Sequence, residues 1–182
     1  MIAPAPFAEI WRGPFLESVH SGHAVICDST GQIMEAWGDP SLVVLPRSSS
    51  KMIQALPLIR SGAADAFGLT TKQLALACAS HQGAHIHVDN VGAWIRDLGL
   101  TDDAFRCGPE ESRDREMKVQ QIRAHESPCR IHNNCSGKHA GFLTLSRHLG
   151  GDENYVAPDH PVQRACLEAF EDVTQETSPG FG

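Results

Sequence analysis

The stretch Arg130 to Leu143 reads R-I-H-N-N-C-S-G-K-H-A-G-F-L and holds more reactive side chains than a hydrophobic core needs. Gly137 and Gly141 would let other backbone or a ligand come close. Ser136 is predicted as the N-cap of a helix whose apolar positions are Phe142, Leu143, Leu145 and Leu149. The free N–H groups of a helix start suit an anion or a developing oxyanion. The alternative is a capped helix whose first turn is simply polar.

Composition indicates an ordinary globular protein. The chain has 182 residues, of which 41% are apolar and 20% charged, enough for one domain with a real core. The net charge of -7 favours neither nucleic acid nor an anionic membrane as a partner. No apolar run reaches the length of a membrane span, and residues 1–15 lack the pattern of a signal peptide. We therefore expect a cytoplasmic protein.

Strand patterns occupy the first part of the chain. Glu17 to Asp28 and Gln32 to Trp37 are predicted to form a β-hairpin around the turn residues between them. Val43 to Leu45 is predicted as a third short strand, which Pro46 ends.

Helical patterns follow. A helix is predicted to start in Arg47 to Leu56, and a second opens with a capping box between Thr70 and Gln73. Later helices are predicted at 88–98, as core packing, at 110–123, as a solvated surface, and at Pro161 to Thr174, with Pro161 in the first turn.

Two serines are candidate nucleophiles. Ser48 and Lys51 are three residues apart, so on a helix they share a face, as in a Ser–Lys pair whose lysine accepts the serine proton. The alternative is an N-cap serine beside a solvated lysine. Ser80 ends an apolar helix before a polar loop with Gly83, which suits a cleft or, equally, a plain helix end.

The thiols allow a metal or a nucleophile. The chain has six cysteines with wide spacing, which favours reduced thiols or metal ligands over a disulfide framework. Cys129, His132, Cys135 and His139 form a C-x2-H-x2-C-x3-H series. Such ligands suit zinc, although four of them on one short turn would be strained. A cysteine beside lysine and histidine could instead be a nucleophile with a lowered pKa.

Three segments in this order resemble the L-asparaginase II family, the Rhizobium etli-type thermolabile bacterial asparaginases. They are R-S-S-S-K from Arg47, C-A-S-H-Q-G from Cys78, and H-N-N-C-S-G-K-H-A-G from His132. The resemblance covers essentially the whole chain. It implies an α+β fold like that of serine β-lactamases and glutaminases, with helices packed against an antiparallel sheet. It also implies a single asparaginase-type domain over 1–182, which we expect to be the N-terminal half of a longer family chain with an incomplete sheet.

The resemblance implies hydrolysis of L-asparagine to L-aspartate and ammonia through an acyl-enzyme, usually in a homodimer. Ser48 and Lys51 match the first Ser–Lys tandem of the family, and Ser80 matches the serine of the second. Cys135 and Lys138 match two zinc ligands, and the residues expected to contact substrate are Arg47, Asn134 and His139.

One departure from the family pattern puts substrate preference in question, because Gly83-Ala84 stands where family members often carry Gly-Glu. Three alternatives remain open: a glutaminase or other Ser–Lys amidase, a catalytically inactive zinc-binding fragment, and a hydrolase that uses Cys135 as nucleophile.

Overall fold

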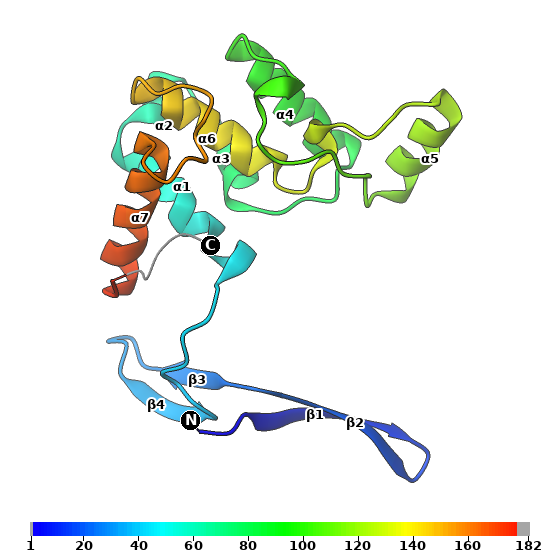
Figure 1. Cartoon of the computed structure of the whole chain (residues 1–182), viewed down its shortest axis with the longest axis vertical. Coiled ribbons are helices and arrows are strands. Elements are labelled where there is room, and N and C mark those ends of the chain that lie inside the picture. Colours follow the sequence, from blue (N-terminus) through cyan, green and yellow to red (C-terminus); the bar gives the residue numbers. More distant parts are fainter. Residues whose placement is uncertain (1, 178–182) are drawn as a thin grey trace. The chain divides into compact units, whose positions relative to one another are not determined.

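A computed structural model describes residues 2–177 and has the α+β composition that the sequence predicts. The chain divides into two compact units, Met1–Leu45 with the strands and Pro46–Gly182 with the helices (Figure 1). Among the described residues, no helix combines the length and hydropathy that a membrane span requires. The expected β-lactamase-like sheet and the single domain over 1–182 stay predictions.

The first unit consists of two antiparallel strand pairs. β1 (Ala5–Arg12) pairs with β2 (Phe15–Gly22), and β3 (Ala24–Cys27) pairs with β4 (Ile33–Trp37). The turn between β3 and β4 is built by Asp28, whose carboxylate accepts the N–H groups of Thr30 at 2.8 Å and Gln32 at 3.0 Å. The predicted hairpin is therefore confirmed in its central part.

Two strand predictions are wrong. Glu17 to Gly22 does not continue into the hairpin but pairs with β1, a strand that the sequence analysis did not predict. Val43 to Leu45 forms no strand, because no other described segment pairs with it, and its side chains are exposed.

The second unit is helical, and α6 (Ser136–His148) lies at its centre. Ten of the thirteen residues of α6 are buried, as expected for a helix that neighbours surround on every side. It packs against α1 (Lys51–Arg60), α3 (Thr71–Cys78), α4 (His85–Asp97) and α7 (Pro161–Thr174). The remaining elements are α2 (Ala63–Ala66), α5 (Arg115–Ala124) and the 3₁₀ turns η1 (Arg47–Ser50), η2 (Asp102–Ala104) and η3 (Arg130–His132).

Two glycines set how closely α6 approaches its neighbours. A Cβ atom on Gly137 would lie 2.6 Å from the carbonyl oxygen of Leu76, and one on Gly141 would lie 3.2 Å from the Cβ of Ala77. The predicted need for close approach at these glycines is thus confirmed: Gly137 faces the backbone of α3, and Gly141 faces the side chains of Ala77 in α3 and Leu58 in α1.

The other helix predictions mostly hold. The capping box of Thr70 and Gln73 is present, α7 runs from Pro161 to Thr174 as predicted, and α4 is buried through its apolar face. The helix predicted from Arg47 begins as η1 and becomes α-helical at Lys51. The prediction of Ser136 as N-cap is wrong: Cys135 holds that position, and the Ser136 hydroxyl donates instead to the carbonyl oxygen of Ile131 at 2.8 Å.

Candidate active site

Lys51 joins three segments that are far apart in the sequence. It is the first residue of α1, and only 3% of it is exposed. Its Nζ lies 2.7 Å from the Oγ of Ser80, 3.3 Å from the carbonyl oxygen of Ala79 and 3.2 Å from the Sγ of Cys135. A lysine amine that is buried among a hydroxyl, a carbonyl and a thiol is well placed for proton transfer.

The two predicted serines lie together beside this lysine. The Oγ of Ser80 is 3.3 Å from the Oγ of Ser48, so the three groups form a chain in the order Lys51, Ser80, Ser48. Among the described residues, the Lys51 amine hydrogen-bonds Ser80 and not Ser48. The structure thus joins Ser48 to Lys51 through Ser80, whereas the sequence spacing had predicted direct contact.

Arg47 orients the turn that carries Ser48. Its φ of 52° lies in the left-handed region, which a residue other than glycine adopts only at a cost in free energy. Its carbonyl oxygen accepts the hydroxyl of Ser50 at 2.8 Å. Non-glycine residues in this region are found preferentially at functional sites. The predicted contact of Arg47 with substrate stays a prediction.

Cys135 is placed at the N-cap of α6 by its asparagine neighbours. The backbone N–H of Cys135 donates to the Oδ1 of Asn133 at 2.9 Å, and its thiol donates to the Oδ1 of Asn134 at 3.0 Å. The sulfur of Cys135 therefore receives a hydrogen bond from Lys51 while donating one to Asn134.

Two carboxylates that the sequence analysis did not single out hold the segment before Cys135. Glu110 accepts the N–H of Asn134 at 3.0 Å, and this bond is the largest of the effects that lower its pKa. Asp102 accepts the N–H groups of Arg130 at 3.1 Å and Ile131 at 2.6 Å. Asp and Glu are suitable acceptors for the free N–H groups at a helix start. However, more than twenty residues separate Asp102 and Glu110 from the N–H groups that they accept, so no local sequence pattern predicts these bonds.

His81 connects the loop after Ser80 to the same segment. Its ring Nε2 lies 2.9 Å from the Oγ of Ser136, its Nδ1 accepts the N–H of Gly83 at 3.1 Å, and its own N–H donates to the carbonyl of Asn134 at 3.0 Å. Burial, as the main cause, lowers the pKa of His81 to about 4. His81 belongs to the C-A-S-H-Q-G motif, but no local pattern indicated a role for it.

Lys138 and His139 lie in the first turn of α6. Burial is the largest cause lowering the pKa of Lys138, whose Nζ is 5.3 Å from the ring centroid of Phe142. His139 is buried, with its Nδ1 2.8 Å from the hydroxyl of Tyr155, and burial lowers its pKa to about 3. The predicted contacts of His139 and Asn134 with substrate stay predictions.

The residues around Cys135 fit a zinc ion only in part. The Cys135 thiol and the Lys138 amine can both coordinate a metal once they are deprotonated. The lowered pKa of Lys138 favours its deprotonated form. However, no group of three or more His, Cys, Asp or Glu side chains that could hold a metal occurs within residues 2–177. The C-x2-H-x2-C-x3-H series is split, because Cys129 lies 3.1 Å from the Nδ1 of His132 while Cys135 contacts Lys51. A tetrahedral zinc site needs more donors than these residues supply.

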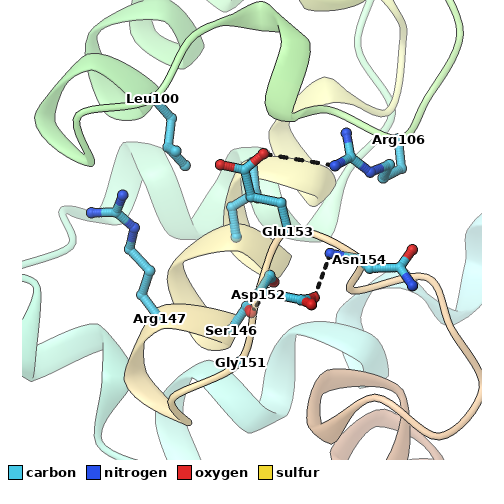
Figure 2. A pocket seen from close by; sticks show the side chains of 9 residues that line it. Leu100, Arg106, Ser146, Arg147, Gly151, Asp152, Glu153 and Asn154 are labelled. Atoms are coloured by element: carbon cyan, nitrogen blue, oxygen red, sulfur yellow. Dashed lines mark hydrogen bonds and ion pairs between the residues drawn. The ribbon is translucent and has the colours of Figure 1, made fainter.

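A surface pocket of about 540 Å³ lies at the other end of α6, near Ser146 and Arg147 (Figure 2). Glu153 reaches across this pocket to Arg106, with 3.7 Å between the charged groups. Because a 13-residue helix is about 20 Å long, this pocket is separate from the groups around Lys51.

Ser146, His160 and Asp152 beside this pocket have the residue types of a catalytic triad but not its proton arrangement. The N–H of Val162 donates to the Nδ1 of His160, so the proton of a neutral ring lies on Nε2, the atom that faces Ser146 at 3.4 Å. The Ser146 hydroxyl in turn donates to the backbone oxygen of Asp152 at 2.5 Å. His160 therefore serves as the N-cap of α7 and is not a base for Ser146.

The sequence model of a protein family described as L-asparaginase II matches residues 8–181. A search of curated proteins finds no match to the chain.

Proposed function

Because the chain belongs to the L-asparaginase II family, we propose that it hydrolyses L-asparagine to L-aspartate and ammonia through a serine acyl-enzyme. Membership of the family supports an asparaginase-type amidohydrolase that acts on a small-molecule substrate. The observation that carries the finer proposal is the unbroken chain of polar groups from Lys51 through Ser80 to Ser48.

The chain of groups supports a proton relay. In its neutral form the Lys51 amine accepts the hydroxyl proton of Ser80, and Ser80 accepts the proton of Ser48 as that oxygen attacks the amide carbon. The protons return along the same path to the departing nitrogen, which leaves as ammonia. Water then attacks the ester, and the relay removes its proton.

Ser48 is the proposed nucleophile because it ends the relay. Its Oγ hydrogen-bonds only the Ser80 hydroxyl among the described side chains, and it lies on the exposed turn η1. Ser80 is engaged by Lys51 on one side and by Ser48 on the other. Cys135, the N-cap of α6, contacts the same lysine, which supports the prediction that the oxyanion lies near this helix start.

The contact between Lys51 and Cys135 also favours a second candidate, a thiol nucleophile. Lysine beside a cysteine stabilises the thiolate, which is the reactive form. Ammonia release that survives alkylation of Cys135 would remove this candidate.

Zinc and the homodimer enter only as proposals. Cys135 and Lys138 would be two of the zinc ligands, and a bound ion would supply positive charge near the substrate. No step of the mechanism passes through the metal. Metal content of the purified chain, measured by atomic emission, should fall in Cys135→Ala. A loss of zinc with an unchanged rate would argue against a catalytic role for it.

The direct test is ammonia release from L-asparagine, with L-glutamine as the competing substrate. We expect Ser48→Ala, Ser80→Ala and Lys51→Met to abolish release. Ser49→Ala is the matched control, because among residues 2–177 this neighbouring hydroxyl hydrogen-bonds only the carbonyl of Pro46. A quenched reaction should show the acyl group on Ser48 by peptide mass mapping. Full activity in Ser48→Ala would contradict the assigned nucleophile, and faster release from glutamine would contradict the assigned substrate.

A further inference from the structure

His81 forms a hydrogen-bonded path whose direction the geometry fixes. The backbone N–H of Gly83 can only donate, and it points at Nδ1, so Nδ1 carries no proton. The proton of the neutral ring therefore lies on Nε2 and is donated to the Oγ of Ser136. The hydroxyl hydrogen of Ser136 continues to the carbonyl oxygen of Ile131. Each donor along this path has one acceptor, so the arrangement admits only one tautomer.

The surroundings keep this path dry and the ring uncharged. His81 is buried and Ser136 is fully buried, and the His81 ring stacks on that of His87 with 5.0 Å between centroids. Burial is the largest effect that disfavours the charged ring; the electrostatic interactions with His87 and Lys51 act in the same direction, whereas Glu110 favours the charged form. A lowered pKa is consistent with the neutral tautomer at pH 7.

The hydrogen-bonded path of His81 lies immediately after Ser80, the serine that contacts Lys51. Ser80 is exposed, and it stands between two anchored neighbours. The carbonyl of Ala79 accepts from Lys51, while the backbone and the ring of His81 are tied to Asn134 and Ser136. Because both ties of His81 end on the segment around Cys135, the backbone that carries Ser80 keeps a fixed relation to α6.

We propose that His81, as the Nε2–H tautomer bonded to Ser136, is a positioning residue that holds Ser80 in contact with Lys51. The proposal rests on the proposed function. The alternative is that His81 has only a local role, in which its Nδ1 accepts the N–H of Gly83 and so shapes the turn after Ser80. The two roles use opposite nitrogens of the same ring, so they can be separated by substitution.

Two near-isosteric variants make the separation. Gln in place of His81 can keep a donor at the Nε2 position for Ser136 but loses the acceptor for Gly83. Asn keeps an acceptor for Gly83 but cannot reach Ser136. We expect His81→Gln to retain most of kcat, whereas His81→Asn and Ser136→Ala lower kcat by about tenfold to a hundredfold with little change in KM. The His81→Asn/Ser136→Ala double variant should lose no more than either single variant.

Thr144→Val is the matched control. It removes a buried hydrogen bond of the same helix, from the Nε1 of Trp94 at 3.0 Å, and should lower stability while leaving kcat unchanged. A readout that needs no asparagine is the rate at which a sulfonyl fluoride labels Ser48 and Ser80, located by peptide mapping. That rate should fall in His81→Asn and not in Thr144→Val. Two-bond ¹H–¹⁵N spectra of the imidazole at pH 7 should show the Nε2–H form.

Activity retained in His81→Asn and lost in His81→Gln would overturn the proposal, as would an Nδ1–H or charged ring. If the unmodified chain releases no ammonia from asparagine, the proposed function fails. The positioning role is then decided by the labelling rates alone: slower labelling in His81→Asn supports it, and unchanged labelling refutes it.

Discussion

Replacing Gly137 with alanine tests whether the contact between α3 and α6 sets the geometry of the site. The new Cβ would lie 2.6 Å from the carbonyl oxygen of Leu76 and 2.9 Å from its Cβ. Ordinary C···O contacts are about 3.3 Å or longer, so α3 must move by roughly 0.7 Å. Backbone cannot rotate away as a flexible side chain can.

The expected loss of stability follows from two opposed effects. Overpacking of this kind costs about 2–3 kcal/mol when backbone must shift. Alanine regains at most about 1 kcal/mol over glycine, a value that applies in full to a helix interior and only in part to the first turn, where Gly137 lies. We therefore expect Gly137→Ala to lower the free energy of unfolding by about 1–2 kcal/mol, measured by urea denaturation followed by circular dichroism.

The same displacement should reach the reacting groups. Ser80 follows α3 by two residues, so a shift of α3 along α6 changes the distance from Ser80 to Lys51. A misplacement of about 1 Å can cost on the order of a hundredfold in rate, so we expect kcat for ammonia release to fall by about tenfold.

Gly92→Ala is the control for this experiment. Gly92 lies inside α4, and its added Cβ would meet only the ends of two flexible side chains, Arg96 at 3.1 Å and Ile131 at 3.2 Å. It should leave the rate unchanged and alter stability by less than about 1 kcal/mol. The reasoning would be refuted if Gly137→Ala were as stable and as active as Gly92→Ala.

Three further predictions concern single side chains. The pKa of His81 is depressed from 6.5 to about 4 in the folded chain, so the unfolded chain binds more protons between these values. Stability should fall as pH drops from about 6.5 toward 4, and urea titrations across this window should show a weaker pH dependence in His81→Gln. Arg47→Gly should relieve the left-handed backbone cost and raise the unfolding free energy by up to about 1 kcal/mol; a raised KM for asparagine would support substrate contact, and an unchanged KM would remove it. Tyr155→Phe deletes the hydroxyl that accepts the N–H of Arg106 and bonds His139, and should cost about 1–3 kcal/mol in urea denaturation; a neutral result would show that neither bond matters.

Local sequence patterns predicted the helices that are determined by interactions between residues close together in the sequence. The amphipathic spacing and Pro161 determine α7, and a reciprocal side-chain bond between Thr70 and Gln73 starts α3. By contrast, Val43 to Leu45 has the composition of a strand but lacks a described partner strand, which no local pattern reveals.

The sequence motifs singled out individual residues of the candidate site but did not predict which of their side chains hydrogen-bond one another. The motifs identified Ser48, Ser80 and Cys135, yet Lys51 meets Ser80 across 29 positions and Cys135 across 84. Helical spacing paired Lys51 with Ser48, whereas in the structure the Lys51 amine hydrogen-bonds Ser80. His81 was missed as a connecting residue because its partner, Ser136, was predicted as a helix cap, and only the fold places their side chains together.

The burial of α6 has a consequence for how the site opens. Segments of a native protein unfold locally with different free energies, and the most buried helices exchange their amide hydrogens last. The buried part of α6, the helix that Cys135 caps, belongs to the protected class, whereas Ser48 lies on an exposed 3₁₀ turn. Amide exchange should therefore divide one site into an early-opening half and a late-opening half. We expect mild heating to separate Ser48 from Ser80 and to stop the proposed ammonia release reversibly, well before the helical unit unfolds.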